Sequence, residues 1–168
     1  MKVCKPALII LLIMYCYGAM GQQPETVINT DHIKNKWKNI PYATISEAQK
    51  LDVYLPDQGN GPFPVILAIH GGAFKFGDKA SSHMVFMLEG LKKGYAVISI
   101  NYRMSGEAKA PQLIHDVKAA VRWVRAHASE YKLNGNKIAA WGPSAGGHLS
   151  ALVGTSAEVK ALEDFSLG

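Results

Sequence analysis

A serine flanked by glycines is the residue in this sequence best suited to covalent chemistry. Gly142-Pro143-Ser144-Ala145-Gly146 fits the pattern G-x-S-x-G, in which a serine occupies a sharp turn between a strand and a helix. Only glycine fits at the positions two before and two after the serine, because a Cβ there would crowd the turn. Ser144 is therefore the predicted nucleophile. A hydroxyl reacts only when a base removes its proton, so the turn alone does not establish an enzyme.

A second glycine turn follows an earlier apolar run. Residues 65–69 predict a strand buried on both faces, and His70-Gly71-Gly72-Ala73-Phe74 comes directly after it. We expect the backbone N–H groups of Gly71, Gly72, Ala73 and Ala145 to form an oxyanion hole. Each such donor stabilises a tetrahedral intermediate by roughly 3 kcal/mol. The alternatives are an ordinary Gly-Gly turn and a serine that merely caps a helix.

The histidines near these turns are weak candidates for the base. His70 closes the buried strand, where a neutral imidazole would hold the glycine loop by hydrogen bonds. His148 lies one helical turn after Ser144 and is expected to pack or to contact the loop. Asp116, next to His115, opens a helix, where an acid suits the helix dipole and need do nothing else. The remaining histidines, His32, His83 and His127, are expected at the surface.

Strands and helices alternate along the chain. Strands are predicted over residues 51–55 (alternating and half-buried), 65–69, 95–102 and 137–141, and helices over 83–93, 112–128 and from the serine turn to about 157. In the first helix we place Val85, Leu88 and Leu91 on one face and Gly94 as the stop. Residues 134–136 read as a turn, and residues 22–41 as an irregular connecting segment. This order predicts an α/β fold with a parallel sheet.

The first 21 residues have the pattern of a secretory signal peptide. Lys2 and Lys5 precede an apolar run that is too short to span a membrane, and small residues follow, with cleavage expected near Gly21. An uncleaved anchor is the alternative. Removal would lower the formal net charge from +5 to +3 and take away Cys4 and Cys16, the only cysteines. We therefore expect a secreted or periplasmic protein without disulfides, and no nucleic-acid partner.

From about Tyr42 to its end the chain resembles the α/β-hydrolase superfamily. Within it, residues 70–74 and 142–149 are similar to the branch with an H-G-G-[GA]-[FW] loop and an extended elbow, which includes acetyl esterases, hormone-sensitive-lipase-like carboxylesterases and feruloyl-esterase-like enzymes. Residues 101–103, Asp116 and residues 120–124 are also similar to it. The resemblance implies a mostly parallel sheet with helices on both faces, a serine–acid–histidine triad, acyl-enzyme catalysis, and no metal or organic cofactor.

The sequence departs from this family after the elbow helix. The family's acid and histidine come well after the elbow, whereas this sequence ends at Gly168, 24 residues past Ser144, and has no histidine after His148. The acidic residues in that stretch, Glu158, Glu163 and Asp164, lie too close behind the helix. We expect an N-terminal part, residues 42–168, of a hydrolase domain, with an unpaired sheet edge, its base and acid beyond Gly168, and no activity alone.

The expected function is a secreted serine hydrolase of carboxylic esters, acting on acetyl or feruloyl groups of plant polysaccharide. The expected substrate is a small or polysaccharide-linked ester, with no stable membrane association after signal cleavage; the oligomeric state stays open. One alternative is a serine peptidase of the prolyl-oligopeptidase type, and another is a non-catalytic hydrolase-fold binding protein. Dinucleotide binding is disfavoured, because no G-x-G-x-x-G follows the first strand of a βα unit.

Overall fold

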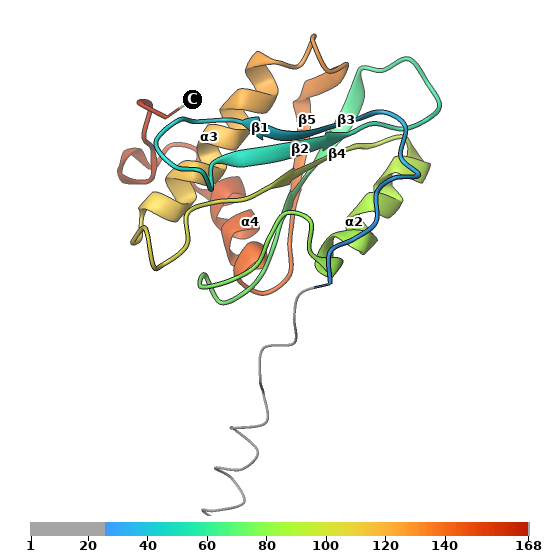
Figure 1. Ribbon diagram of the computed structural model, residues 1–168. Helices are drawn as coiled ribbons and strands as arrows, with labels where there is room; N and C mark the ends of the chain where they lie inside the picture. The colour runs from blue at the N-terminus through green and yellow to red at the C-terminus, as the bar shows by residue number, and fades with distance from the viewer. Residues whose placement is uncertain (1–25, 168) are drawn as a thin grey trace, which may run out of the picture.

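A five-stranded sheet runs through the computed structural model of the protein (Figure 1). The structure describes residues 26–167, so the predicted signal peptide and both cysteines lie outside the described residues. The strands are β1 (Lys36–Pro41), β2 (Lys50–Tyr54), β3 (Phe63–Ile69), β4 (Ala96–Ile100) and β5 (Leu133–Trp141), in the spatial order β1-β2-β4-β3-β5.

Parallel and antiparallel pairs divide the sheet into two parts. β3 pairs in parallel with both β4 and β5, whereas β2 pairs antiparallel with β1 and β4. The α/β-hydrolase fold class is confirmed, with antiparallel pairing confined to the β1–β2 side. Because β3 and β5 are parallel neighbours, their carboxyl ends meet at one edge of the sheet. The glycine loop and the serine turn, which follow these two strands, are brought together by this topology.

Helices cover both faces of the sheet (Figure 1). α3 (Gln112–Ala126) and α4 (Ala145–Thr155) lie on one face, and the segment of η1 (Ser82–Met84), α2 (Val85–Leu88) and η2 (Glu89–Lys93) lies on the other; a further short helix, η3 (Lys160–Leu162), follows α4. Alternate residues of β3 enter different apolar clusters. Val65 and Leu67 pack in the cluster that includes α3, while Ala68 packs with Met84 and Met87. The period of two in β3 therefore fills a core on each side.

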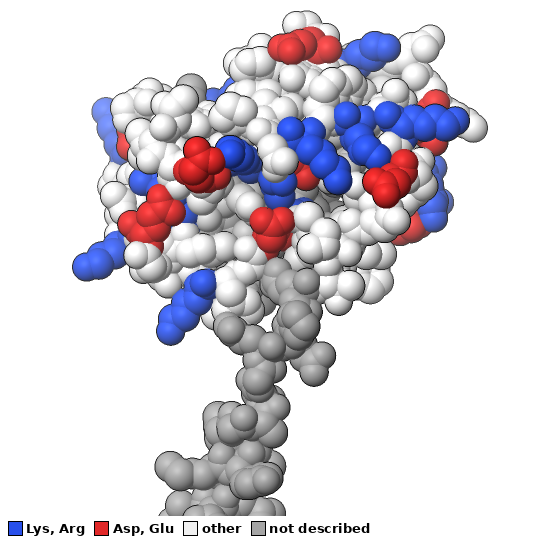
Figure 2. Space-filling model, in the orientation of Figure 1, with Lys and Arg blue, Asp and Glu red and all other residues white. Residues whose placement is uncertain are grey.

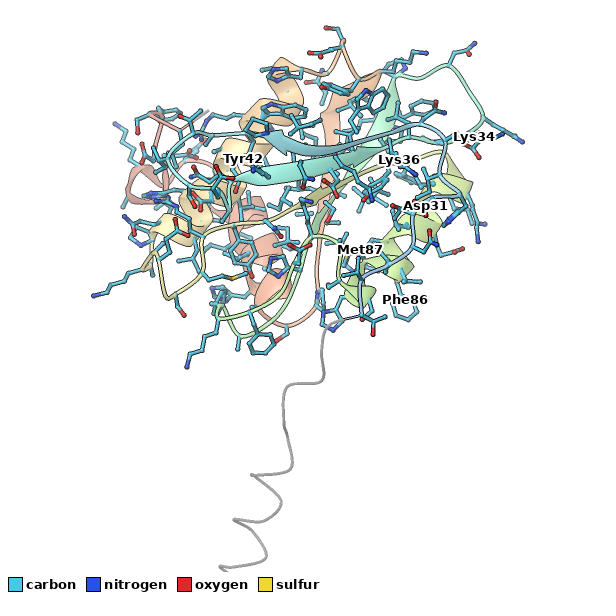
Figure 3. All side chains as sticks on the ribbon, in the orientation of Figure 1. Asp31, Lys34, Lys36, Tyr42, Phe86 and Met87 are labelled. Atoms are coloured by element: carbon cyan, nitrogen blue, oxygen red, sulfur yellow. The ribbon has the colours of Figure 1, made fainter. Side chains whose placement is uncertain are left out.

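The predicted helix over residues 83–93 is wrong in its regularity and at one position of its predicted apolar face. Leu88 and Leu91 pack against the core cluster, as predicted. One α-helical turn stands between two 3₁₀ segments, and Gly94 ends them in a left-handed conformation, as predicted. Met84 and Met87 are the buried residues, whereas Val85 is half exposed. Figure 3 shows Met87 directed toward the sheet and Phe86 directed away from it. Flexible methionine side chains fill the space beneath this irregular segment.

Two predictions of irregular structure are also wrong. The connecting segment, residues 22–41, ends in β1, which joins the sheet through β2 and carries Trp37, edge-on to Tyr131 at 5.2 Å. Residues 134–136 belong to β5: Phe63 pairs with Leu133 and Val65 with residue 138, so the intervening residues bulge out of register. Pairing with neighbouring strands, which no local pattern shows, creates both stretches of strand.

Residues 51–54 of strand β2 are all buried, rather than half-buried as their alternation predicts. Asp52 is 1% exposed and forms an ion pair with Lys79 at 2.8 Å; it also accepts hydrogen bonds from the Asn39 N–H and the Tyr54 hydroxyl. A buried carboxylate is tolerated when a cation and hydrogen bonds replace its water. The polar position in the alternation therefore marks a buried ion pair.

The surface carries both signs of charge. On the face drawn in Figure 2, lysine and arginine side chains are interspersed with aspartate and glutamate. Among residues 26–167, no helix combines the length and apolar character needed to cross a membrane.

Candidate active site

The turn between β5 and α4 is packed tightly against the end of β3. A Cβ at Gly142 would lie 2.1 Å from the carbonyl oxygen of Ile69, and one at Gly146 would lie 2.0 Å from the same oxygen. Both distances are far inside van der Waals contact with backbone atoms. The glycines two positions before and after Ser144 are therefore required by the fold, for the steric reason that the sequence pattern indicates.

Ser144 stands between these glycines in a strained conformation. Its φ is 50° and its ψ is −119°, outside the regions that L-residues ordinarily occupy. It precedes the first residue of α4, yet its side chain forms no capping hydrogen bond to the helix, and the residue is exposed. A helix-capping role is thus contradicted. Strain held in place by the surrounding structure is common at functional sites, where it aims a side chain outward.

The glycine loop lies directly against Ser144. A Cβ at Gly71 would meet the Pro143 carbonyl oxygen at 3.0 Å and the Ser144 Cβ at 3.5 Å. Gly72 has a φ of 113°, and its carbonyl accepts hydrogen bonds from the N–H groups of residues 75 and 76. Ala73, with a φ of 51°, is exposed in a left-handed conformation. The structure thus brings Gly71 beside the serine and folds Gly72 and Ala73 into the same compact turn.

Ala145 is the remaining predicted donor. It is the first residue of α4 and is buried, and its N–H has no acceptor within the helix at that position. The next two N–H groups, of Gly146 and Gly147, both donate to the Pro143 carbonyl. The positive end of the α4 dipole adds to the field at this point. Ala145 and Gly71 therefore flank Ser144 with backbone from two different turns.

His70 supports the glycine loop from below. Its Nδ1 donates to the Gly71 carbonyl at 2.7 Å, and its ring stacks on Tyr102 with centroids 4.6 Å apart. The Tyr102 hydroxyl donates to the His70 carbonyl at 3.1 Å, and burial raises the pKa of Tyr102 to about 12. A Cβ at Gly77 would lie 2.4 Å from His70 Nδ1, so the loop closes over the ring. The predicted loop-holding role of His70 is confirmed.

Asp78 fixes the far end of the same loop. Its carboxylate accepts hydrogen bonds from Asn101 Nδ2 at 2.8 Å and from the Ala80 N–H at 2.7 Å. Asn101 in turn accepts from the Lys79 N–H at 2.6 Å. Burial alone would raise the pKa of Asp78, but the two hydrogen bonds outweigh it and leave the pKa below its usual value. Asp78 therefore joins the loop to the end of β4.

Asp116 does more than the sequence predicts. It is fully buried within α3, and its carboxylate accepts hydrogen bonds from Nε and Nη2 of Arg103, the latter at 2.7 Å. The Arg103 N–H and Gln49 Nε2 also donate to it. The side-chain hydrogen bond to Asp116 raises the pKa of Arg103. The expectation that Asp116 merely suits the helix dipole is wrong, because this carboxylate anchors the chain that leaves β4.

Other titratable residues on and around the two helices α3 and α4 also have structural partners. The exposed His148 donates its backbone N–H to the Ser144 carbonyl and places its ring edge-on to Phe74 at 5.9 Å. Glu163 forms ion pairs with Lys118 at 2.7 Å and with Arg122 at 3.0 Å. The predicted surface position is wrong for His127, which is half-buried and stacked on a tryptophan.

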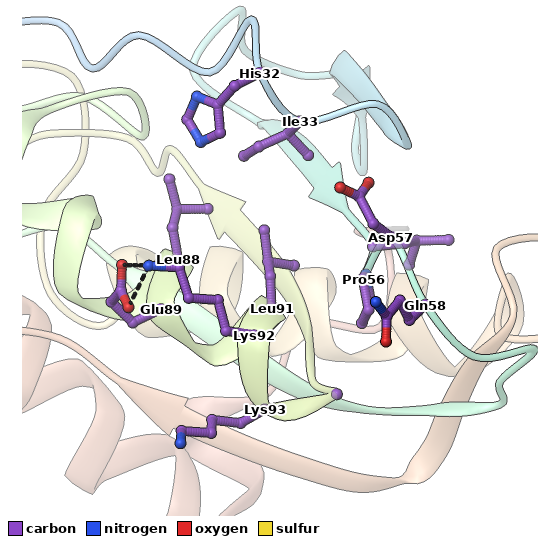
Figure 4. Close-up of a pocket in the computed structure, with 12 residues that line it drawn as sticks. His32, Ile33, Pro56, Asp57, Gln58, Leu88, Glu89, Leu91, Lys92 and Lys93 are labelled. Atoms are coloured by element: carbon purple, nitrogen blue, oxygen red, sulfur yellow. Dashed lines mark hydrogen bonds and ion pairs between the residues drawn. The ribbon is translucent and has the colours of Figure 1, made fainter.

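A pocket of about 600 Å³ lies away from Ser144, at the amino end of the parallel strands (Figure 4). His32, Asp57 and Leu91 are among its lining residues, and an exposed Glu89–Lys92 ion pair lies at its side. Since β3, β4 and β5 are parallel, this end is opposite the serine turn.

Within residues 26–167, no group of three or more histidine, cysteine, aspartate or glutamate residues is arranged to hold a metal ion.

Comparison with known proteins identifies the family. The model of the BD-FAE family matches residues 51–166, which include both glycine turns and the strands before them. The chain belongs to the BD-FAE family of α/β-hydrolase esterases. Among curated proteins, it is similar to the esterase LipC of Mycobacterium tuberculosis, with 39% identity over 111 residues, covering 66% of this chain and 28% of LipC.

Two solved structures share the fold of this BD-FAE chain. A bifunctional GH43-CE protein of Bacteroides eggerthii aligns with a TM-score of 0.71 and 45% identity, over 75% of this chain and 16% of that protein. A truncated carbohydrate esterase from gut microbiota aligns with a TM-score of 0.67 and 40% identity, over 76% of this chain and 45% of that one. In each comparison the chain spans less than half of the protein that it matches.

Proposed function

We propose that this chain carries the nucleophile and the oxyanion hole of a secreted or periplasmic hydrolase of carboxylic esters. The observation that supports it most is the exposed Ser144, held at a φ of 50° between β5 and α4 with Gly71 packed against its Cβ. Membership in an esterase family gives the reaction class. The signal-peptide pattern of the first 21 residues supports a secreted or periplasmic location.

Ser144 Oγ attacks the ester carbonyl carbon, and the carbonyl oxygen takes the negative charge. The N–H groups of Ala145 and of Gly71, Gly72 and Ala73 would stabilise that oxyanion, at roughly 3 kcal/mol per donor. The Ser144 proton must pass to a base. His70 is buried beneath the loop and His148 packs on Phe74, so we propose that a histidine outside residues 26–167 is the base.

The proposed substrates are acetyl or feruloyl esters attached to plant polysaccharide. Two structurally similar proteins are described as a bifunctional GH43-CE protein and a carbohydrate esterase, which supports a carbohydrate-linked alcohol. A serine peptidase would share the elbow but would cleave amides, and a binding protein would cleave neither bond. The three functions are therefore distinguished by which bond is cleaved: an ester, an amide or neither.

The test compares ester and amide substrates with the protein as its own host produces it. Acetylated and feruloylated xylan are offered beside a dipeptide amide, and the released acid or amine is measured. We expect acid release from xylan, no amide cleavage, and loss of activity in Ser144→Ala. Amide cleavage would contradict the proposal in favour of a peptidase. Equal activity of wild type and Ser144→Ala would remove Ser144 from the reaction.

A further inference from the structure

The pocket of about 600 Å³ at the amino end of the parallel strands has an apolar interior. Ile33 and Leu55 line it and are 5% and 4% exposed, and the partly buried Leu88 and Leu91 line it from α2 and η2. Figure 4 shows the Leu88 and Leu91 side chains directed across the pocket toward His32 and Ile33. A ligand in this pocket would therefore rest on aliphatic side chains.

Three polar side chains of the same pocket are available to a ligand. His32, Asp57 and Gln58 are exposed, and within residues 26–167 their side chains take part in no hydrogen bond or ion pair. They present a carboxylate that accepts, an amide that donates and accepts, and an imidazole that does both. A ligand hydroxyl also donates and accepts, so these three side chains are suited to bind hydroxyl groups.

The charges around the pocket cancel, which disfavours an ionic ligand. Glu89 and Lys92 pair with each other at 2.8 Å, and the other charged lining residues, Asp57 and Lys93, have opposite signs. A lining without net charge gives no general attraction for an anion or a cation. Among the described residues that line it there is no phenylalanine, tyrosine or tryptophan, so a nucleobase would find no large ring to stack on.

A neutral pyranose sugar has the properties that this lining favours. The C–H groups of its ring form an apolar face that can pack on Leu88 and Leu91, while its hydroxyls point outward toward the polar side chains. The volume of about 600 Å³ lies in the range of small-molecule sites and leaves room for more than one sugar ring.

We propose that this pocket is a second, non-catalytic site, which binds a neutral stretch of the polysaccharide whose esters are cleaved at Ser144. The identity of the polymer rests on the proposed function, whereas sugar binding itself does not require Ser144 to react. The seven residues of β3 separate the two ends of the sheet by about 23 Å. A small ester therefore reaches Ser144 only, but a polymer held in the pocket presents its esters to Ser144 at a raised effective concentration.

The first arm of the test measures sugar binding without reaction. Isotope-labelled, host-produced protein is titrated with xylohexaose, which carries no ester, and backbone amide shifts are followed by NMR. Shifts in residues 88–94 report the proposed pocket, and shifts in residues 71–74 report the Ser144 edge. We expect saturable shifts in residues 88–94. Shifts confined to residues 71–74, or larger shifts of residues 88–94 with inorganic phosphate than with xylohexaose, overturn the inference.

The second arm removes the polar groups. Asp57→Ala and Gln58→Ala are combined, and Asn60→Ala is the matched control, an exposed residue of the same turn that does not line the pocket. Loss of two hydrogen-bonding side chains should weaken xylohexaose binding at residues 88–94 by at least about tenfold. The double variant should also raise KM for acetylated xylan by at least about threefold and leave kcat/KM for p-nitrophenyl acetate unchanged. Asn60→Ala should change none of these, and equal values in the two proteins overturn the inference.

The outcomes separate this inference from the proposed function. If the protein cleaves no ester, the proposed function fails, and the xylohexaose titration still decides whether the pocket binds sugar. If esters are cleaved at Ser144 but xylohexaose shifts no amide of residues 88–94, the proposed function stands and only the sugar-binding pocket fails.

Discussion

The elbow around Ser144 and the loop of residues 71–77 follow neighbouring parallel strands, but different interactions hold them in shape. The shape of the elbow depends on close backbone packing. The glycines at 142 and 146 have no Cβ, so the backbone of the turn can lie directly against the Ile69 carbonyl. The loop is fixed by polar side chains, chiefly His70 beneath it and Asp78 at its end. An added methyl group should therefore break the elbow, and a removed side chain should release the loop.

The largest effect is expected from Gly146→Ala. Its Cβ would lie 2.0 Å from the Ile69 carbonyl oxygen, where backbone must move, so we expect the free energy of unfolding to fall by at least about 3 kcal/mol. Gly154→Ala is the matched control, because it lies in the same helix with no atom within 4 Å. In Gly154→Ala the free energy of unfolding should rise by about 0.5–1 kcal/mol. Urea denaturation of both variants measures the difference, and similar values would contradict steric locking of the elbow.

The next largest effect is expected from His70→Ala. Loss of the hydrogen bond to Gly71 and of the stack on Tyr102 should lower the free energy of unfolding by about 2 kcal/mol and speed amide exchange in residues 71–77. His127→Ala is the control, since His127 also stacks on an aromatic ring and bonds a carbonyl, of Trp123, but does not contact the loop. Faster loop exchange in both variants would mean that His70 does not hold the loop specifically.

A smaller, stabilising effect is expected from Ser144→Gly. Glycine tolerates the φ of 50°, so relief of backbone strain should raise the free energy of unfolding by about 1 kcal/mol. Ser144→Ala keeps the strained backbone and should leave stability unchanged. Ser150→Gly, in the middle of the same helix, should lose about 0.5 kcal/mol. Thermal unfolding compares the three, and a destabilised Ser144→Gly would show that the elbow is not strained.

The smallest expected effect is the contribution of Asp78 to the loss of folding stability at low pH. Because hydrogen bonds lower the pKa of folded Asp78, its contribution to stability is present above the pKa of the unfolded chain and is lost as pH falls through the folded value. We expect wild type to lose stability below about pH 4 more steeply than Asp78→Asn, which keeps the shape without the charge. Denaturation midpoints from pH 2 to pH 7 measure this, and parallel curves would assign the acid sensitivity to other carboxylates.

The two glycine turns could be predicted from sequence because their requirements are local. The elbow pattern carries its own steric reason, and the loop directly follows an apolar strand. β1 could not be predicted, since Lys36–Pro41 becomes a strand only by pairing with β2. The roles of Asp52 and Asp116 depend on partners distant in sequence, Lys79 and Arg103. For Asp52, the local sequence showed only that a carboxylate stands inside an otherwise apolar strand.

The apolar pocket beside α4, lined in part by Phe74, Leu149 and Leu152, could also not be predicted from the sequence. Its walls come from the glycine loop, the loop before α3 and two helices, and their spacing is set by packing. His148 illustrates the limit: the sequence places it one turn from Ser144, but only the structure shows its ring against Phe74.

The most direct test of the central claim is covalent labelling of Ser144. The host-produced protein is treated with a fluorophosphonate, which reacts with serines whose hydroxyl is activated, and the modified peptide is mapped by mass spectrometry. We predict a single label on Ser144, none on Ser150 of the same helix, and none in folded Ser144→Ala. A folded protein without label, or with the label on another serine, would contradict Ser144 as the nucleophile.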